Sequence, residues 1–178
     1  MLDDYGFEIF EQNEFPIAYL ITFRTYGTWL HGDERWAIRR NRKRPSESKI
    51  LPPNVPLEER MSEELKHAPI LLSQVQRGIV EDGIREVCRI REFDLHAVNA
   101  RSNHVHSVIG AKSKPERIAD TLKAYSTRRL RDQGLIDREM QVWSRGRSRR
   151  YLWKPRHLNA AIEYVLYGQG DLPFELED

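Results

Sequence analysis

Residues 94–111, DLHAVNARSNHVHSVIGA, contain the pattern that decides the fold. Apolar and polar residues alternate in two runs, which is typical of half-buried strands, and Asn103 stands at the short turn between them. We therefore predict a hairpin of two adjacent strands. The second strand carries His104 and His106, and because side chains alternate along a strand, both imidazoles are expected on one face.

The elements around this hairpin predict an α+β fold. Residues 31–70 are polar and proline-rich, so we expect an excursion there, with a short helix over 57–66. Ser73 and Gln76 form a capping-box pattern that starts one helix. The expected order is a strand over 18–30, a helix over 73–92, strands over 94–102 and 104–111, a helix over 113–134, a strand over 149–153 and a helix over 157–167. The first six match a ferredoxin-like split βαβ sandwich with an antiparallel sheet, followed by a C-terminal helix.

The composition is that of a globular protein, and we expect one domain over residues 1–178. No apolar run is long enough for a membrane helix, and the acidic start does not resemble a signal peptide. The single cysteine, Cys88, cannot form an internal disulfide and is expected to be a buried thiol. These features favour a cytoplasmic protein that does not bind membranes.

The net charge of +2 conceals a basic body between acidic tails at 1–14 and 171–178. Nine of the 27 acidic residues lie in the tails, so the remainder carries a formal charge of +11. Arginines interleaved with aromatic residues at 35–44 and 145–156 are typical of nucleic-acid binding, although they also suit solvated loops. The candidate nucleic-acid-binding residues are Arg39, Arg40, Arg42, Lys43, Arg44, Lys123, Arg128, Arg147, Arg149 and Arg150.

The histidine pair and one tyrosine suggest a chemistry. Two neutral imidazoles on one strand face can bind a divalent cation, with Mg²⁺ or Mn²⁺ allowed if oxygen ligands join them. On the last helix, Tyr164 lies at the edge of the apolar stripe, which suits an accessible phenol as well as a packing residue. A bound cation would help this weak nucleophile attack a phosphodiester. Tyr125 is the rival nucleophile, but its helical spacing indicates core packing.

Four other histidines have no partner at chelating spacing and are expected to be structural: His31, His67, His96 and His157. A supporting role at the site stays open for His157, because it shares a helix side with Tyr164.

Four segments carry a resemblance to a known family. They are YLITFRTYGTWLHGD, LHAVNARSNHVHSVIGAKSKPERIADTLKAYSTRRLR, VWSRGRSRRYLW and AAIEYVLYGQGD, within Ala18 to Gly170. Together they resemble the single-tyrosine transposases of the HUH (histidine–hydrophobe–histidine) nuclease superfamily, nearest to transposase-like proteins related to REP-associated tyrosine transposases. The motif NHVH and the tyrosine of the last helix occur in the family's order.

The resemblance implies a ferredoxin-like endonuclease and strand transferase that cuts single-stranded DNA at or beside hairpins, for transposition or recombination. It places the metal-binding pair on His104 and His106 and the nucleophile on Tyr164. The family is commonly dimeric, so a homodimer is expected, with the tyrosine helix serving either its own or the partner's histidines. The third ligand is usually an amide one turn after the tyrosine. Here that position is Gly168, and Gln169 supplies the amide.

Two alternatives remain open at the level of sequence. Gly168 favours a catalytically impaired DNA- or RNA-binding protein that recognises structured repeats. A small metal-dependent phosphoesterase that uses water as its nucleophile would form no adduct with the protein.

Overall fold

The computed structural model describes residues 15–29, 37–39, 49–51 and 54–168, with the backbone alone for 37–39 and 49–51. A four-stranded antiparallel sheet has the order β4-β5-β1-β6. The strands are β1 (Ala18–Arg24), β4 (Asp94–Ala100), β5 (His104–Gly110) and β6 (Ser148–Leu152), and a separate pair is formed by β2 (Ala37–Arg39) and β3 (Lys49–Leu51). The helices are α1 (Val55–Glu63), α2 (Gln74–Ile90), α3 (Pro115–Asp132) and α4 (Pro155–Tyr167).

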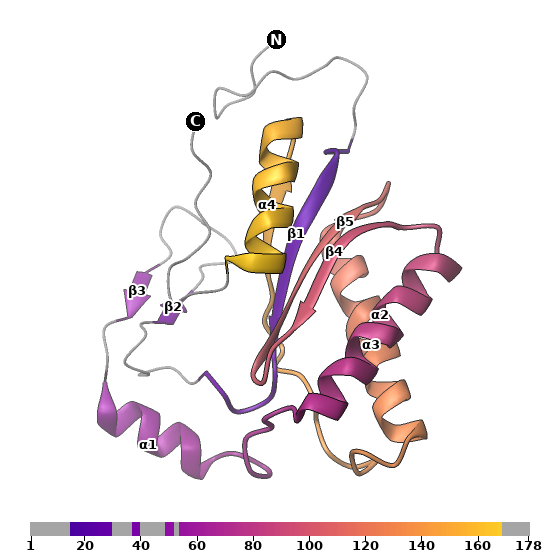
Figure 1. Cartoon of the computed structure of the whole chain (residues 1–178). Coiled ribbons are helices and arrows are strands. Elements are labelled where there is room, and N and C mark those ends of the chain that lie inside the picture. The colour runs from indigo at the N-terminus through magenta and orange to yellow at the C-terminus, as the bar shows by residue number, and fades with distance from the viewer. Residues whose placement is uncertain (1–14, 30–36, 40–48, 52–53, 169–178) are drawn as a thin grey trace.

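The order β1-α2-β4-β5-α3-β6 with this strand arrangement is the ferredoxin-like split βαβ sandwich, so the predicted fold class is confirmed. Helices α2 and α3 cover one face of the sheet, and α4 lies against the other (Figure 1). The predicted hairpin is present, with β4 and β5 adjacent and antiparallel. Among the described helices, none has the length and apolarity that a membrane crossing requires.

Two hydrophobic clusters separate the faces. The larger lies under α2 and α3 and includes Phe23, Val105 and Leu122, all fully or almost fully buried. The smaller joins the opposite sheet face to Ala161 and Val165 of α4. Alternation along each strand produces this division, since neighbouring residues point to opposite faces.

Local signals explain the helix ends. The Ser73 hydroxyl accepts from the Gln76 N–H at 3.2 Å, and the Gln76 side chain accepts from the Ser73 N–H at 2.8 Å, so the predicted capping box is confirmed. The apolar face of α2 buries Cys88, and burial raises the pKa of this thiol to about 12. Cys88 is therefore a buried thiol, as predicted.

The first strand is shorter than predicted. It ends at Arg24, whereas the sequence pattern continues to residue 30. The chain turns at Gly27, whose φ of 74° is the left-handed conformation that glycine adopts most readily. The Tyr26 N–H donates to the Val142 carbonyl at 2.9 Å, which holds the turn against the segment before β6. The predicted helix over 57–66 is α1, shifted towards the N-terminus.

Candidate active site

His104 and His106 lie on β5 on the sheet face that α4 covers, so the predicted common face is confirmed. Their ring centroids are 4.7 Å apart and the ring planes meet at 75°. Imidazole nitrogens bind a cation at ~2.1 Å, so two rings this close can bind the same ion. The strand geometry alone therefore brings two imidazoles together.

Hydrogen bonds orient both rings. Nδ1 of His106 is hydrogen-bonded to the Thr22 hydroxyl at 2.6 Å, and Nδ1 of His104 donates to the Asn103 side-chain oxygen at 2.7 Å. Thr22 lies directly opposite His106 in the register of β1 and β5. Partners at Nδ1 fix the ring orientation, and metal-binding histidines commonly have such a partner on the nitrogen that does not bind the metal.

The surroundings keep His106 neutral. Its side chain is buried, and burial lowers its pKa to about 3, with the positive charges of His104, Arg24 and Arg101 acting in the same direction. A neutral imidazole is the form that coordinates a metal. His106 is therefore in the ligating state at neutral pH.

Tyr164 projects from α4 towards this pair. Its ring centroid lies 5.3 Å from that of His106, at an interplanar angle of 72°, and its side chain is half-buried, as its place at the edge of the apolar stripe predicts. The Asn99 amide on β4 donates to the Val165 carbonyl at 3.1 Å and fastens the helix to the sheet. The phenol and the two imidazoles thus belong to one site within one chain.

The end of α4 passes close to Tyr164. A Cβ added at Gly168 would come within 3.1 Å of the Tyr164 Cα and 3.5 Å of its ring. The Gly168 N–H donates to the Tyr164 carbonyl at 3.0 Å, so the chain passes close to the tyrosine at this point. Glycine suits this close approach, whereas a larger residue requires a small adjustment of the helix end.

The donor set suits a divalent cation in part. Two oriented imidazoles are present, but no group of three or more His, Cys, Asp or Glu able to hold a metal occurs among the described residues. The predicted third ligand, Gln169, lies outside the described residues. His104 and His106 fit a metal that takes further ligands from oxygen donors such as amides, water or phosphate.

Comparison with known families decides the identity. Residues 67–162, more than half of the chain, match the family model described as "Transposase IS200 like". The chain belongs to the IS200-like transposase family. Its function is accordingly transposase-like processing of DNA, and the resemblance to single-tyrosine transposases is confirmed.

Two solved structures are similar to this IS200-like transposase. One is a candidate transposase from Deinococcus radiodurans, with 12% identity, a TM-score of 0.48 and coverage of 92% of this chain and 98% of that one. The other is a REP-associated tyrosine transposase bound to a REP hairpin, with 12% identity, a TM-score of 0.48 and coverage of 89% and 70%. No curated protein sequence matches the chain. Because both TM-scores lie below 0.5, the family assignment rests on the sequence match.

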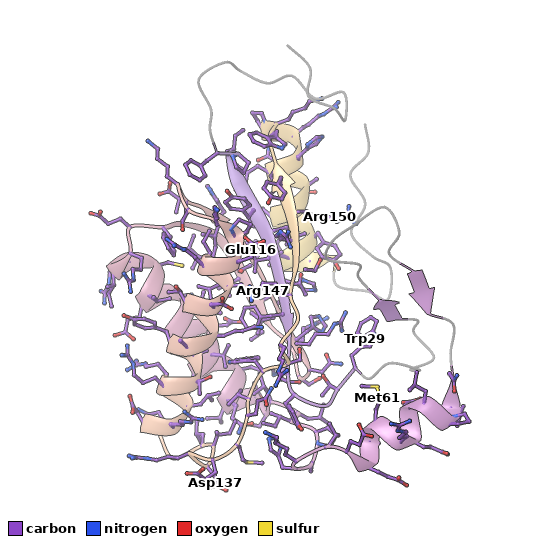
Figure 2. All side chains as sticks on the ribbon, turned by 180° about the vertical axis from the view of Figure 1, so that it is seen from behind. Trp29, Met61, Glu116, Asp137, Arg147 and Arg150 are labelled. Atoms are coloured by element: carbon purple, nitrogen blue, oxygen red, sulfur yellow. The ribbon has the colours of Figure 1, made fainter. Side chains whose placement is uncertain are left out.

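The basic residues predicted to bind nucleic acid divide between the two faces of this IS200-like transposase. Arg147 pairs with Asp120 at 2.8 Å and Arg149 with Glu116 at 2.9 Å, both partners on α3. Arg150 lies opposite Leu20 and therefore on the face of the histidine pair. Figure 2 shows Glu116 and Arg147 together and Arg150 on the side of α4.

Two further predicted residues line a cavity between α3 and the segment that follows it. Lys123 and Arg128 share this cavity with Arg131 and Arg138. The Lys123 ammonium donates to the Ser144 and Gly146 carbonyls at 2.9 Å each, so it also holds the chain that leads into β6. Of the first basic cluster, Arg39 lies on β2 with its side chain outside the described residues, as are Arg40, Arg42, Lys43 and Arg44.

The rival residues lie elsewhere. Tyr125 packs against the larger cluster on the α3 side, with the sheet between it and the histidine pair, and the Arg128 guanidinium lies 4.2 Å from its ring centroid. The His67 ring packs at a tilt against Tyr26 and accepts from the Gln141 N–H. His96 is exposed on β4, and His157 is buried in α4. His31 lies outside the described residues.

Sequence reasoning missed the residues that orient the histidines. Asn103 had a usable signal, because it directly precedes His104 at the predicted turn. Asn99, which fastens α4 and not the histidines, lies opposite His106 because β4 ends at Ala100, two residues earlier than predicted. Thr22 had none, since its partner is 84 residues away. Arg24 and Arg101 were also missed, because their closeness to His106 depends on where three strands end.

Proposed function

We propose that this protein is a metal-dependent endonuclease and strand transferase that acts on single-stranded DNA at or near hairpins, through a covalent phosphotyrosine intermediate. The observation that carries the proposal is the position of the Tyr164 ring, 5.3 Å from the ring of His106 and on the same side of the sheet as His104. This arrangement supplies a nucleophile and two candidate metal ligands, which are components that the reaction needs.

His104 and His106 would hold Mg²⁺ or Mn²⁺, which when bound draws charge from the phosphate oxygens and orients the ester. Tyr164 forms a bond from its phenolic oxygen to phosphorus, and the bond from phosphorus to one sugar oxygen breaks. The net change moves the phenolic proton to that sugar oxygen, which leaves as a hydroxyl. Attack by a hydroxyl from another strand reverses the step and restores the tyrosine.

The surroundings of the site suit a polyanionic strand. Arg24, Arg101 and Arg150 lie on or beside the face that carries the histidines, and their charge attracts the phosphate backbone. We extend the proposal to a cytoplasmic homodimer, with Tyr164 acting beside the histidines of its own chain. The contact between Tyr164 and His106 within one chain supports this placement.

The test is the formation of a covalent adduct. Wild-type protein is incubated with Mn²⁺ and pooled hairpin oligonucleotides with single-stranded flanks, and the products are separated under denaturing conditions. We expect DNA attached to wild-type protein and to Tyr125→Phe, and none attached to Tyr164→Phe, which should still bind the pool. An adduct formed by Tyr164→Phe would contradict the assignment.

One observation favours a second function, a DNA- or RNA-binding protein without catalysis. The position one turn after Tyr164 is Gly168, so it has no side chain to offer as a ligand. This version expects salt-sensitive binding of hairpins without cleavage at any Mn²⁺ concentration. Products without an adduct would instead indicate a phosphoesterase that uses water.

A further inference from the structure

Arg24 occupies the position next to the histidine pair on the central strand. It is the last residue of β1 and lies directly opposite His104 on β5. Residues opposite each other in antiparallel strands share a face, with Cβ atoms about 5 Å apart. Arg24 is half-buried, so its side chain contacts the protein and keeps part of its surface exposed.

Trp29 holds the guanidinium of Arg24. The Arg24 Cζ lies 3.3 Å from the centroid of the Trp29 ring. A guanidinium held over the face of an indole by a cation–π contact loses much of its freedom to reorient. The contact therefore restricts the directions in which Arg24 can donate hydrogen bonds.

The turn between these two residues is itself fastened to the histidine strand. The Thr28 hydroxyl donates to the Thr25 carbonyl at 3.0 Å, which closes the turn and brings Trp29 back towards Arg24. The Thr25 N–H and hydroxyl both donate to the Asn103 carbonyl, at 3.0 and 3.1 Å. Asn103 also accepts from His104, so one set of bonds positions the ligand and the arginine together.

Two arginines belong to this end of the site. Arg24 lies opposite His104 in the register of β1 and β5, and the Arg101 N–H donates to the His104 carbonyl at 2.8 Å. A divalent cation on the same histidines would repel them. An anion between the cation and the guanidiniums relieves that repulsion, and a phosphodiester is the anion that a DNA strand supplies.

We infer that Arg24 binds the DNA phosphate that lies beside the histidine pair, and that Trp29 is the positioning residue that aims it. The inference rests on the proposed function for the identity of the strand, and it adds a contact that sequence analysis did not assign. Arginine suits this task because its planar fork donates two parallel hydrogen bonds to phosphate oxygens.

The test measures binding rather than cleavage, in a Tyr164→Phe background. A hairpin oligonucleotide is selected with this variant in Mn²⁺, and a series is made in which each phosphate in turn becomes a neutral methylphosphonate. In the Tyr164→Phe protein we expect one phosphate position whose neutralisation weakens binding about tenfold or more. Adding Arg24→Gln should make binding insensitive to that position, to within about twofold.

Matched variants separate a specific contact from loss of charge or fold. Arg85→Gln removes an arginine of α2 that pairs with Glu81 and Asp82, and it should leave the position profile unchanged. Trp29→Leu should reduce the sensitivity at the same position, and Trp29→Phe should restore part of it. If Arg24→Gln does not fold, Arg24→Lys, which keeps the charge, replaces it in the test. Binding by Arg24→Lys should be less sensitive to neutralisation of that phosphate.

An unchanged profile in both Arg24 variants would overturn the inference, even if overall affinity fell. The outcome is independent of the proposed chemistry. If wild-type protein forms no adduct but the binding profile depends on Arg24, the proposed nuclease activity is rejected and the phosphate contact stands. If the adduct forms but the profile does not depend on Arg24, the phosphate contact is rejected and the nuclease activity stands.

Discussion

The two faces of the sheet use neighbouring residues of the same strands for different purposes. On the face under α2 and α3, β1 presents Tyr19, Ile21 and Phe23, all buried in the larger cluster. On the opposite face the same strand presents Ala18, Leu20, Thr22 and Arg24, and the side chains change from apolar to charged along its length.

The second face changes in the same direction on each strand. On β5, Val108 is followed towards the same end by His106 and His104, and on β4 Ala97 is followed by Asn99. Helix α4 buries the apolar end with Ala161 and Val165, and Tyr164 lies where the apolar and polar parts meet. One face therefore stabilises the fold along its whole length, whereas the other is apolar at one end and carries the candidate site residues at the other.

The largest effect is expected from the stabilising face. Phe23→Ala removes a side chain that is 1% exposed and meets Trp143 edge to face, with ring centroids 4.9 Å apart. We expect the free energy of unfolding in urea to fall by about 3–5 kcal/mol, from lost burial and the cavity left behind. Thr22→Val, at the neighbouring position on the other face, should lower the free energy of unfolding by only about 1 kcal/mol. Equal losses at the two positions would remove the distinction between the faces.

The second effect belongs to the chemical face. His104→Ala should reduce cleavage by about 100-fold or more and abolish the rise in melting temperature that Mn²⁺ produces, because one of two imidazole ligands is lost. Stability without metal should change little, since His104 is only half-buried. The exposed His96 offers the control, and His96→Ala should keep both cleavage and the response to Mn²⁺. A full Mn²⁺ response in His104→Ala would argue against the ligand role.

The smallest effect concerns Lys123, on the α3 side. Burial, with the charge of Arg147, lowers the pKa of Lys123 to about 8. The folded state thus loses its proton at lower pH than the unfolded state, so the unfolding free energy should rise as pH increases from about 8 towards 10.5. Lys123→Met should remove about 1 kcal/mol of that rise, measured by urea unfolding at pH 7 and pH 9.5. An identical pH dependence in the variant would refute the burial argument.

Local patterns made most of the fold predictable. The capping box at Ser73, the alternation through the hairpin and the apolar stripe of the last helix depend on residues a few positions apart, and each gave the correct element. The end of β1 was predicted too late, because the aromatic residues after Arg24 look strand-like while the turn at Gly27 depends on contact with Val142.

The site was predictable where residues share one element and less so where they meet through the sheet. His104 and His106 lie on one strand, and Tyr164 stood out by its place on the helix. The roles of Thr22 and Arg24 depend on the register of β1 against β5, which no local pattern reveals. The basic residues at 147–150 illustrate the same point. Two of them pair with acidic residues of α3, while side-chain alternation along β6 directs Arg150 to the opposite face.

The most direct measurement locates the DNA on the protein. After reaction with Mn²⁺ and hairpin oligonucleotides, nuclease and trypsin digestion should leave a nucleotide on the peptide that begins at His157, which contains both Tyr164 and Tyr167. Fragmentation of this peptide should place the added mass on Tyr164. A nucleotide found on the exposed Tyr167, or on Tyr125 across the sheet, would contradict the account.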